Sequence, residues 1–189
     1  MTWLPRAQAW WMGPRWLPHD GPSPFTLEAN AGPLELPAPE AQRPTTIVAL
    51  ADVEEGETER DGYRERWRTL AAAAGSQKAG LNYGDLEEGQ LPCPPHWHGV
   101  EEECFVILDG EGEALLGEDW HPVRRGHVLV SPPASGIAHA LRGGPGGLRY
   151  LGYGTRYPGD YAFFPRSRKL SFRHGIILRV EEVDYFEGE

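Results

Sequence analysis

Two histidines and a glutamate, His96, His98 and Glu103, lie close together in the chain. On a strand, residues i and i+2 project from the same face, so the imidazoles of His96 and His98 can point at one spot. A turn at Gly99 predicts that Glu103 lies on the next strand. Imidazole and carboxylate groups together suit a divalent transition metal, with Fe, Mn, Ni, Zn, Co and Cu as candidates. The segment therefore predicts a site for one such ion per chain.

A third histidine, His139, lies on a later expected strand and can complete this set. Two histidines and one carboxylate leave several coordination positions for water, O2 or a substrate, and a third histidine still leaves one or two. An open coordination sphere is typical of metal chemistry, whereas a structural metal site is closed by its protein ligands. We therefore expect His96, His98, Glu103 and His139 to be the metal ligands.

The spacing of these residues resembles the two motifs of the cupin superfamily. The segment His96-x-His98-x4-Glu103-x6-Gly110 is similar to the first motif. The glycine that opens this motif would be Gly89, which lies one residue too far from His96. This departure leaves every ligand of the first motif in place.

The second cupin motif resembles the segment Gly126-x5-Pro132 followed by Gly136-x2-His139. The interval between the proline and the glycine is stretched here, and Gly143 stands where the motif closes on an asparagine. Neither departure removes a ligand. Together the two motifs cover about residues 79–155, and the wider chain looks like the single-domain bacterial cupins of the cupin-2 type.

The resemblance implies an all-β fold, a double-stranded β-helix or jelly-roll barrel, and a bound metal, but no particular reaction. It also favours Glu103 over the neighbouring Glu101 and Glu102, because Glu103 alone has the six-residue gap to Gly110. We expect Glu101 and Glu102 to be exposed turn residues.

The other histidines and the two cysteines have no ligand-like context. We expect structural roles for His19, His121, His127 and His174. Cys104 alternates away from Glu103 along its strand, which predicts a buried, small apolar residue. Cys93 lies just before His96 at the mouth of the expected site, where an unpaired and inert thiol is the favoured interpretation.

Apolar side chains near the ligands predict the lining of a substrate pocket. On the strand that follows the Gly99 turn, Phe105 and Ile107 share a face with Glu103. Our candidates for contact with a substrate are Tyr83, Phe105, Ile107 and Leu141.

The rest of the chain must position this site. Residues 1–44, rich in tryptophan and proline, predict an irregular arm that packs on the barrel or reaches across a dimer partner. Residues 45–78 predict a strand over 45–53, an acidic loop and one short helix between about residues 61 and 75, where apolar residues recur at helical spacing. Residues 79–189 predict the barrel with a C-terminal extension, because short apolar runs alternate there with Gly and Pro turns.

Composition excludes several classes of function. The chain has 18 Lys+Arg against 28 Asp+Glu, a net charge of −10, which argues against binding to nucleic acid or anionic membranes. Two cysteines without a CxxC pair exclude a disulfide scaffold and favour a reduced, cytoplasmic setting. No apolar run is long enough for a membrane helix, and the start lacks the apolar region of a signal peptide.

Three functions stay open on this evidence. The first is a metal-dependent dioxygenase, lyase or isomerase that acts on a small oxygenated molecule, with Glu103 also serving as proton acceptor. The second is a cupin that binds or senses a small ligand without turnover. The third is a β-barrel that the metal merely stabilises. We expect a homodimer, because a small barrel needs its open strand edges covered.

Overall fold

The structure is a computed structural model of the chain, and it describes residues 2–12, 15–32, 45–173 and 175–188. The chain divides into two compact units, Met1–Gln42 and Arg43–Glu189. The second unit contains every candidate metal ligand, so it is the unit that positions the site.

The first unit contains a small antiparallel sheet, not the irregular arm expected from its prolines. The strands lie in the order β1-β2-β3, with bounds β1 (Thr2–Leu4), β2 (Ala9–Met12) and β3 (Arg15–Pro18). The rings of Trp3 and Trp10 lie 5.2 Å apart between centroids, one on each of two paired strands. Trp3 and Trp10 of this unit therefore pack on one another, and the expectation that the unit packs on the barrel stays a prediction.

Helices are short in the described part of the chain. Helix α1 (Pro24–Asn30) begins after Ser23, whose Oγ accepts a hydrogen bond from the backbone N of Thr26 at 3.1 Å. The 3-10 helix η1 (Leu50–Asp52) and helix α2 (Leu70–Ala73) are each about one turn long. Within the described ranges, no helix is long and apolar enough to cross a membrane.

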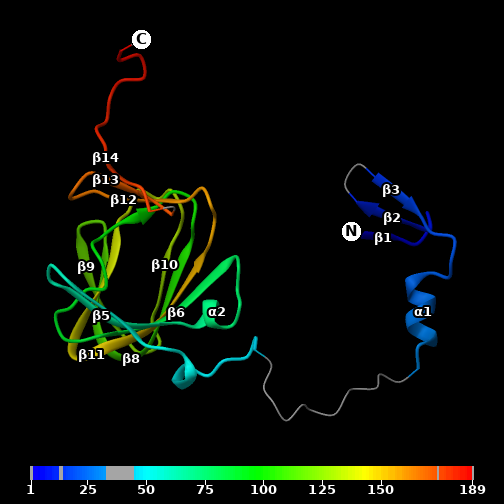
Figure 1. Cartoon of the computed structure of the whole chain (residues 1–189), viewed down its shortest axis with the longest axis horizontal. Coiled ribbons are helices and arrows are strands. Elements are labelled where there is room, and N and C mark those ends of the chain that lie inside the picture. The colour runs from blue at the N-terminus through cyan, green and yellow to red at the C-terminus, as the bar shows by residue number, and fades with distance from the viewer. Residues whose placement is uncertain (1, 13–14, 33–44, 174, 189) are drawn as a thin grey trace. The chain divides into compact units, whose positions relative to one another are not determined.

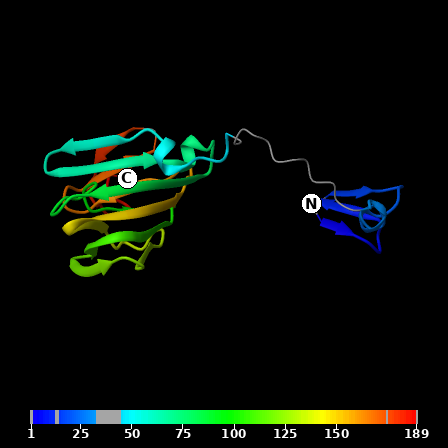
Figure 2. The same cartoon turned by 90° about the horizontal axis from the view of Figure 1, so that it is seen from below.

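The second unit consists of two antiparallel sheets (Figure 1). The larger sheet has the order β10-β8-β11-β6-β5-β4, with β9 also paired to β8; its strands are β4 (Gly56–Arg60), β5 (Tyr63–Thr69), β6 (Ala79–Leu86), β8 (Glu103–Leu116), β9 (Asp119–Arg124), β10 (Val128–Ser131) and β11 (His139–Thr155). The smaller sheet has the order β14-β13-β12-β7; its strands are β7 (Trp97–His98), β12 (Tyr161–Phe164), β13 (Lys169–Phe172) and β14 (Ile177–Arg179). In Figure 2 the cyan strands β4 and β5 lie beside β6 in green and β11 in yellow. These sheets confirm the predicted all-β, jelly-roll fold.

The helix predicted between residues 61 and 75 is wrong. Strand β5 occupies residues 63–69, and only the single turn of α2 follows it. Tyr63 and Trp67 are four residues apart, a spacing that fits one face of a helix and equally one face of a strand. Because β5 pairs with β4 on one side and with β6 on the other, sheet pairing decides between the two periods.

The strand predicted over residues 45–53 is also wrong, since this segment contains turns and η1. The acidic segment after it, expected to be a loop, contains β4. The carboxylates of this segment face arginines of β5. Oε1 of Glu57 lies 3.0 Å from Nη2 of Arg64, and Oε2 of Glu55 lies 3.0 Å from Nη2 of Arg68. These cross-strand pairs offset the mutual repulsion of the acidic side chains.

Strands β8 and β11 are longer than the apolar runs that predicted them, and they pair along most of their length at the centre of the larger sheet. The largest fully buried side chains are Leu86, Ile107, Leu115 and Leu148, from β6, β8 and β11. Packing of this core holds β8 and β11 in place, and the first residues of these two strands, Glu103 and His139, are candidate ligands.

Gly110 lies in the left-handed region with φ +77°, and a Cβ added there would lie 2.1 Å from the carbonyl O of Gly147. Gly126 has φ +89°, but nothing lies within 4 Å of an added Cβ. We expect Gly126→Ala to lower the free energy of unfolding by about 1–2 kcal/mol through backbone strain alone. Gly110→Ala should lower the free energy of unfolding by about 3 kcal/mol or more, because the clash of the added Cβ with the carbonyl O of Gly147 adds to the backbone strain. Urea denaturation measures both variants, and equal losses would contradict this account.

Candidate metal centre

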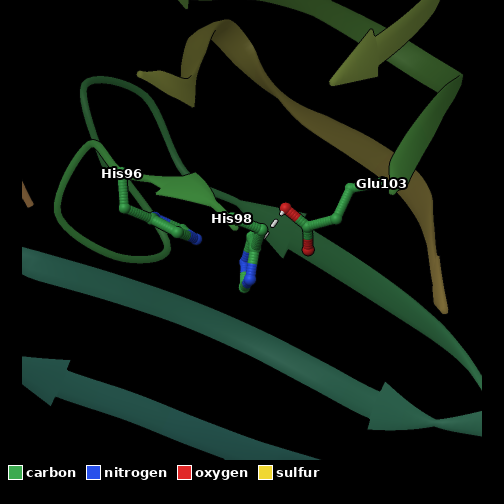
Figure 3. Close-up of side chains that lie close together, drawn as sticks. All are labelled: His96, His98 and Glu103. Carbon is green, nitrogen blue, oxygen red and sulfur yellow. Dashed lines mark ion pairs between the residues drawn. The ribbon is translucent and has the colours of Figure 1, made fainter. Parts of the chain in front are cut away.

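Three histidines and one glutamate converge where strands of the two sheets begin. His98 lies on β7 and His96 directly precedes it, Glu103 starts β8, and His139 starts β11. The ligating atoms of His96, His98 and Glu103 lie within 4.8 Å of one another (Figure 3). Oε2 of Glu103 is 2.8 Å from Nε2 of His139 and 3.5 Å from Nε2 of His98. The structure therefore brings all four predicted ligands together.

Backbone pairing holds His139 beside His96. The backbone N of each residue donates to the carbonyl O of the other, at 3.3 Å from His96 and 2.9 Å from His139. His98 is paired in turn with Ala162 on β12. The ring centroid of His96 lies 5.0 Å from those of both His98 and His139. Strand pairing, rather than a free loop, thus sets the spacing of the three imidazoles.

Hydrogen bonds at Nδ1 orient two of these rings. Nδ1 of His96 lies 2.9 Å from the carbonyl O of Pro94, and Nδ1 of His98 lies 2.6 Å from Oδ2 of Asp160. A carbonyl or carboxylate oxygen can only accept, so the ring proton lies on Nδ1 and leaves a lone pair on Nε2 of the neutral imidazole. Partners of this kind fix the tautomer and orientation of metal-binding histidines.

The third ring also has a partner at Nδ1, because this atom of His139 lies 2.9 Å from Oγ of Ser131, a hydroxyl that can either donate or accept. Asp160 is itself held in place, since its Oδ1 accepts hydrogen bonds from the backbone N of Val100 and of Glu101, each at 3.0 Å. No sequence motif marks Ser131 or Asp160 as a partner of these rings. Asp160 lies far from His98 in the chain, and only the pairing of β7 with β12 brings them together.

The electrostatics of the cluster favour the metal-binding forms of its groups. Burial, together with the neighbouring imidazole of His139, lowers the pKa of His96 to about 4. Burial acts to raise the pKa of Glu103, but the imidazoles of His139, His98 and His96 outweigh it, so the pKa of Glu103 lies below its ordinary value. At neutral pH Glu103 is therefore a carboxylate and His96 is uncharged, which are the forms that bind metals.

Two buried atoms of the cluster lack a hydrogen bond: Oε2 of Glu103 and Nε2 of His139. They face each other at 2.8 Å. An unsatisfied buried polar group costs about 1–3 kcal/mol, and a cation shared by both atoms would offset that cost. Imidazole nitrogens with one carboxylate also suit the transition metals named above. The residues present could therefore hold such an ion.

The cluster opens into a cavity of about 470 Å³. One wall of the cavity is the inner face of the larger sheet, where alternate residues of β5, β6, β8 and β11 point the same way. Three positions of this wall have no side chain, namely Gly80, Gly152 and Gly154. These glycines leave space beside the ligands that side chains would otherwise fill.

Two of the four predicted substrate contacts, Phe105 and Leu141, line this cavity. Ile107 shares the strand face of Phe105 but lies deeper, in the hydrophobic core, with 2% of its surface exposed. Tyr83 lies outside the cavity lining, because alternation along β6 turns it away from the face that carries Gly80. The structure thus brings Phe105 and Leu141, but not Ile107 and Tyr83, to the candidate site.

The expectation that Glu101 is an exposed turn residue is wrong, since only 4% of it is exposed. Its Oε1 accepts a hydrogen bond from the backbone N of Tyr157 at 2.6 Å and also contacts the guanidinium of Arg173. Glu102 is exposed, as expected. Glu101 thus joins the cavity wall to two neighbouring segments instead of turning to solvent.

The two cysteines differ in their relation to the cavity. Cys93 lines it, with Sγ 3.8 Å from Nδ1 of His96. Burial raises the pKa of Cys93 to about 12, so its thiol stays protonated and is a weak nucleophile, in agreement with the interpretation as an inert thiol. Cys104 is half-buried and is not among the residues that line the cavity.

A second carboxyl group, Glu65 on β5, faces the cavity. The hydroxyl of Tyr150 donates to Oε1 of Glu65 at 2.5 Å. Gly84 makes room for the pair, because a Cβ there would lie 2.4 Å from Cζ of Tyr150 and 2.5 Å from that Oε1. Burial raises the pKa of Glu65 to about 7, although the hydrogen bond from Tyr150 opposes the shift. No sequence motif marks Glu65, since the residues around it come from other strands.

The family model described as "Cupin domain" matches residues 82–145, a segment that contains all four candidate ligands. This match agrees with the resemblance found in the two motifs. A search of curated proteins finds no match to this sequence.

Solved structures support the same fold. A putative sugar phosphate isomerase from Acidithiobacillus ferrooxidans has a TM-score of 0.66 at 19% identity, covering 74% of this chain and 97% of that chain. A sugar phosphate isomerase of the cupin superfamily from Silicibacter pomeroyi has a TM-score of 0.64 at 19% identity, covering 70% of this chain and 92% of that one. The polyketide cyclase RemF from Streptomyces resistomycificus has a TM-score of 0.50 at 23% identity, covering 58% of this chain and 78% of that one.

The raised pKa of Glu65 predicts a specific pH dependence of stability. Because the folded-state pKa of about 7 lies above the ordinary value of 4.5, the folded protein retains this proton over that range and the unfolded chain does not. The stabilisation is present below pH 4.5 and is lost as the pH rises through about 7, a change of about 3 kcal/mol. Glu65→Gln keeps an oxygen for the Tyr150 hydroxyl but does not titrate.

The variant Glu65→Gln should therefore gain stability relative to the wild type as the pH rises from about 5 to about 8. Denaturant unfolding of both proteins at each pH measures the difference. Other titrating groups are common to both proteins and cancel in the comparison. A difference that is independent of pH would show that Glu65 titrates normally.

Proposed function

We propose that this chain, whose barrel is a cupin domain, is a metal-dependent enzyme that acts on a small oxygenated molecule as a dioxygenase, lyase or isomerase. The observation that supports this most strongly is the cavity that opens beside His96, His98 and Glu103, with His139 next to Glu103. A metal that only stabilised the barrel would need no such space, because structural sites are closed by protein ligands.

In this proposal His96, His98, Glu103 and His139 hold one divalent transition metal. When bound, the metal would supply Lewis-acid polarisation of a substrate oxygen. The hydrogen bonds at Nδ1 keep the three imidazoles in position whether or not a substrate is present.

The other residues of the cavity would bind the substrate and move protons. Phe105 and Leu141 provide apolar walls that exclude water from the reacting groups. Glu103 could accept a proton in addition to its role as ligand. Glu65 is a second candidate, because its raised pKa near 7 lets it either donate or accept a proton at neutral pH, with its position set by Tyr150.

The alternative is a cupin that binds a small ligand without turnover, and the same cavity supports it. Only a measurement of product can separate the two functions. The homodimer and the cytoplasmic location stay predictions that do not affect this choice.

Metal content tests the ligand set. We expect His98→Ala and His139→Ala to lose most of the metal that the wild type retains, because each removes one of four ligands from a preformed site. His121→Ala is the matched control, since this exposed histidine lies on β9 and is not among the residues that line the cavity. Elemental analysis of protein purified without added metal is the measurement. Equal metal content in all four proteins would refute the assignment.

Turnover tests the enzyme against the binder. The metal-loaded wild type should consume oxygen with a diketone, a flavonoid or a thiol, or should convert a hydroxy or keto compound to a new product detected by NMR. His98→Ala should lose this activity, and His121→Ala should keep it. Saturable binding of a compound with no product would instead favour the non-catalytic cupin.

A further inference from the structure

The cavity contains a guanidinium group that no metal ligand requires. Arg156 directly follows β11, its backbone N donates to the carbonyl O of Lys78, and its side chain lines the cavity. Its Nε lies 3.0 Å and its Nη2 3.3 Å from the point that a Cβ of Gly80 would occupy. The guanidinium therefore covers Gly80 on β6, and a side chain larger than hydrogen at that position would push it away.

Two glycines, Gly80 and Gly154, lie between this guanidinium and the histidine cluster on the larger sheet. Gly154 on β11 is paired with Glu103 on β8 and, on its other side, with Gly80 on β6. Directly paired residues on neighbouring strands project from the same face, so all three positions face the cavity. Two strand spacings, roughly 10 Å, separate the backbones of Glu103 and Gly80. Between them lies only Gly154, so an open path runs along the wall from the Glu103 carboxylate to Arg156.

Arg156 has no carboxylate partner among the described residues, although it is half-buried in a chain of net charge −10. Several arginines of the larger sheet and of the cavity are paired with acidic side chains, whereas Arg124 on β9, which is exposed and lies outside the cavity lining, is not among the paired ones. The pairs are Arg64 with Glu57, Arg66 with Asp85, Arg68 with Glu55, Arg142 with Glu113, Arg149 with Asp109, and Arg173 with Glu101. A half-buried cation that faces a cavity without a partner is a binding group for an anion.

We propose that Arg156 binds a carboxylate at one end of a small organic acid whose other end, bearing a hydroxyl or carbonyl oxygen, reaches the histidine cluster. This inference rests on the proposed function and names its substrate class. A guanidinium pairs bidentately with either a carboxylate or a phosphate. A singly charged carboxylate fits better here, because Arg173, the other arginine of the cavity, is already engaged by Glu101 and leaves Arg156 as the one cavity arginine of the described residues for the ligand. The ligand is therefore an acid with two polar ends.

Isothermal titration calorimetry with three probes tests this inference. Malate carries a hydroxy-acid end for the histidine cluster and a second carboxylate for Arg156. 2-Hydroxybutyrate keeps the hydroxy-acid end, but its only carboxylate adjoins the hydroxyl and cannot reach Arg156 while the hydroxyl is at the cluster. 3-Phosphoglycerate carries a phosphate in place of the second carboxylate. We expect the wild type to bind malate about tenfold more tightly than 2-hydroxybutyrate, the gain of one charge-assisted contact. Arg156→Gln should lose this preference and Arg156→Lys should keep part of it. Arg125→Gln, at an exposed position that does not line the cavity, is the control.

Each protein is titrated first with Co²⁺ alone and then with the probes, in the presence and absence of the metal. Absence of Co²⁺ binding by the wild type would count against the proposed function, while the preference measured without metal would still test Arg156. Failure of the wild type to bind malate, the same affinity for malate and 2-hydroxybutyrate, or an unchanged preference in Arg156→Gln would overturn the inference. Tighter binding of 3-phosphoglycerate than of malate would overturn the choice of a carboxylate.

Discussion

The hydrogen bonds at Nδ1 of the three histidines are the constraint on which the site depends. They leave Nε2 of His98 and His139 facing Glu103, at 3.5 Å and 2.8 Å from its Oε2. Without Asp160 the ring of His98 would lose the partner that fixes its tautomer and orientation. The pairing of β7 with β12, and of His96 with His139, therefore not only stabilises the fold but also sets the positions of the three imidazoles. The sheets thus hold the three imidazoles and the Glu103 carboxylate close together, as a candidate metal site.

Space beside the ligands is the second requirement, and the larger sheet provides it by omitting side chains. Its buried leucines and Ile107 fill the core, whereas Gly80, Gly152 and Gly154 leave the same face of the sheet open near the metal cluster. Along β11, large side chains in one part of the strand pack in the core, and glycines in another part leave space for the cavity.

The ligands could be predicted from the sequence because their spacing is local: His96 and His98 share a strand face, and Glu103 follows one turn later. The partners of these ligands could not. Asp160 and Glu65 reach the site through strand pairings that no local pattern encodes, and neither stands in a motif. The helix predicted between residues 61 and 75 failed for a related reason, since a four-residue apolar spacing fits both periods and only the neighbouring strands select one. Local spacing thus predicted the residues of the candidate site, and long-range pairing determined their surroundings.

X-ray absorption spectroscopy of the Co²⁺-loaded protein tests the central claim most directly, because it reports the atoms bound to the metal. The account predicts a first shell of nitrogen and oxygen atoms with the multiple-scattering signal of three imidazoles, and no sulfur. It also predicts one imidazole fewer in His139→Ala. A sulfur ligand, which would place Cys93 in the first shell, or a spectrum of the wild type without imidazole scattering would contradict it.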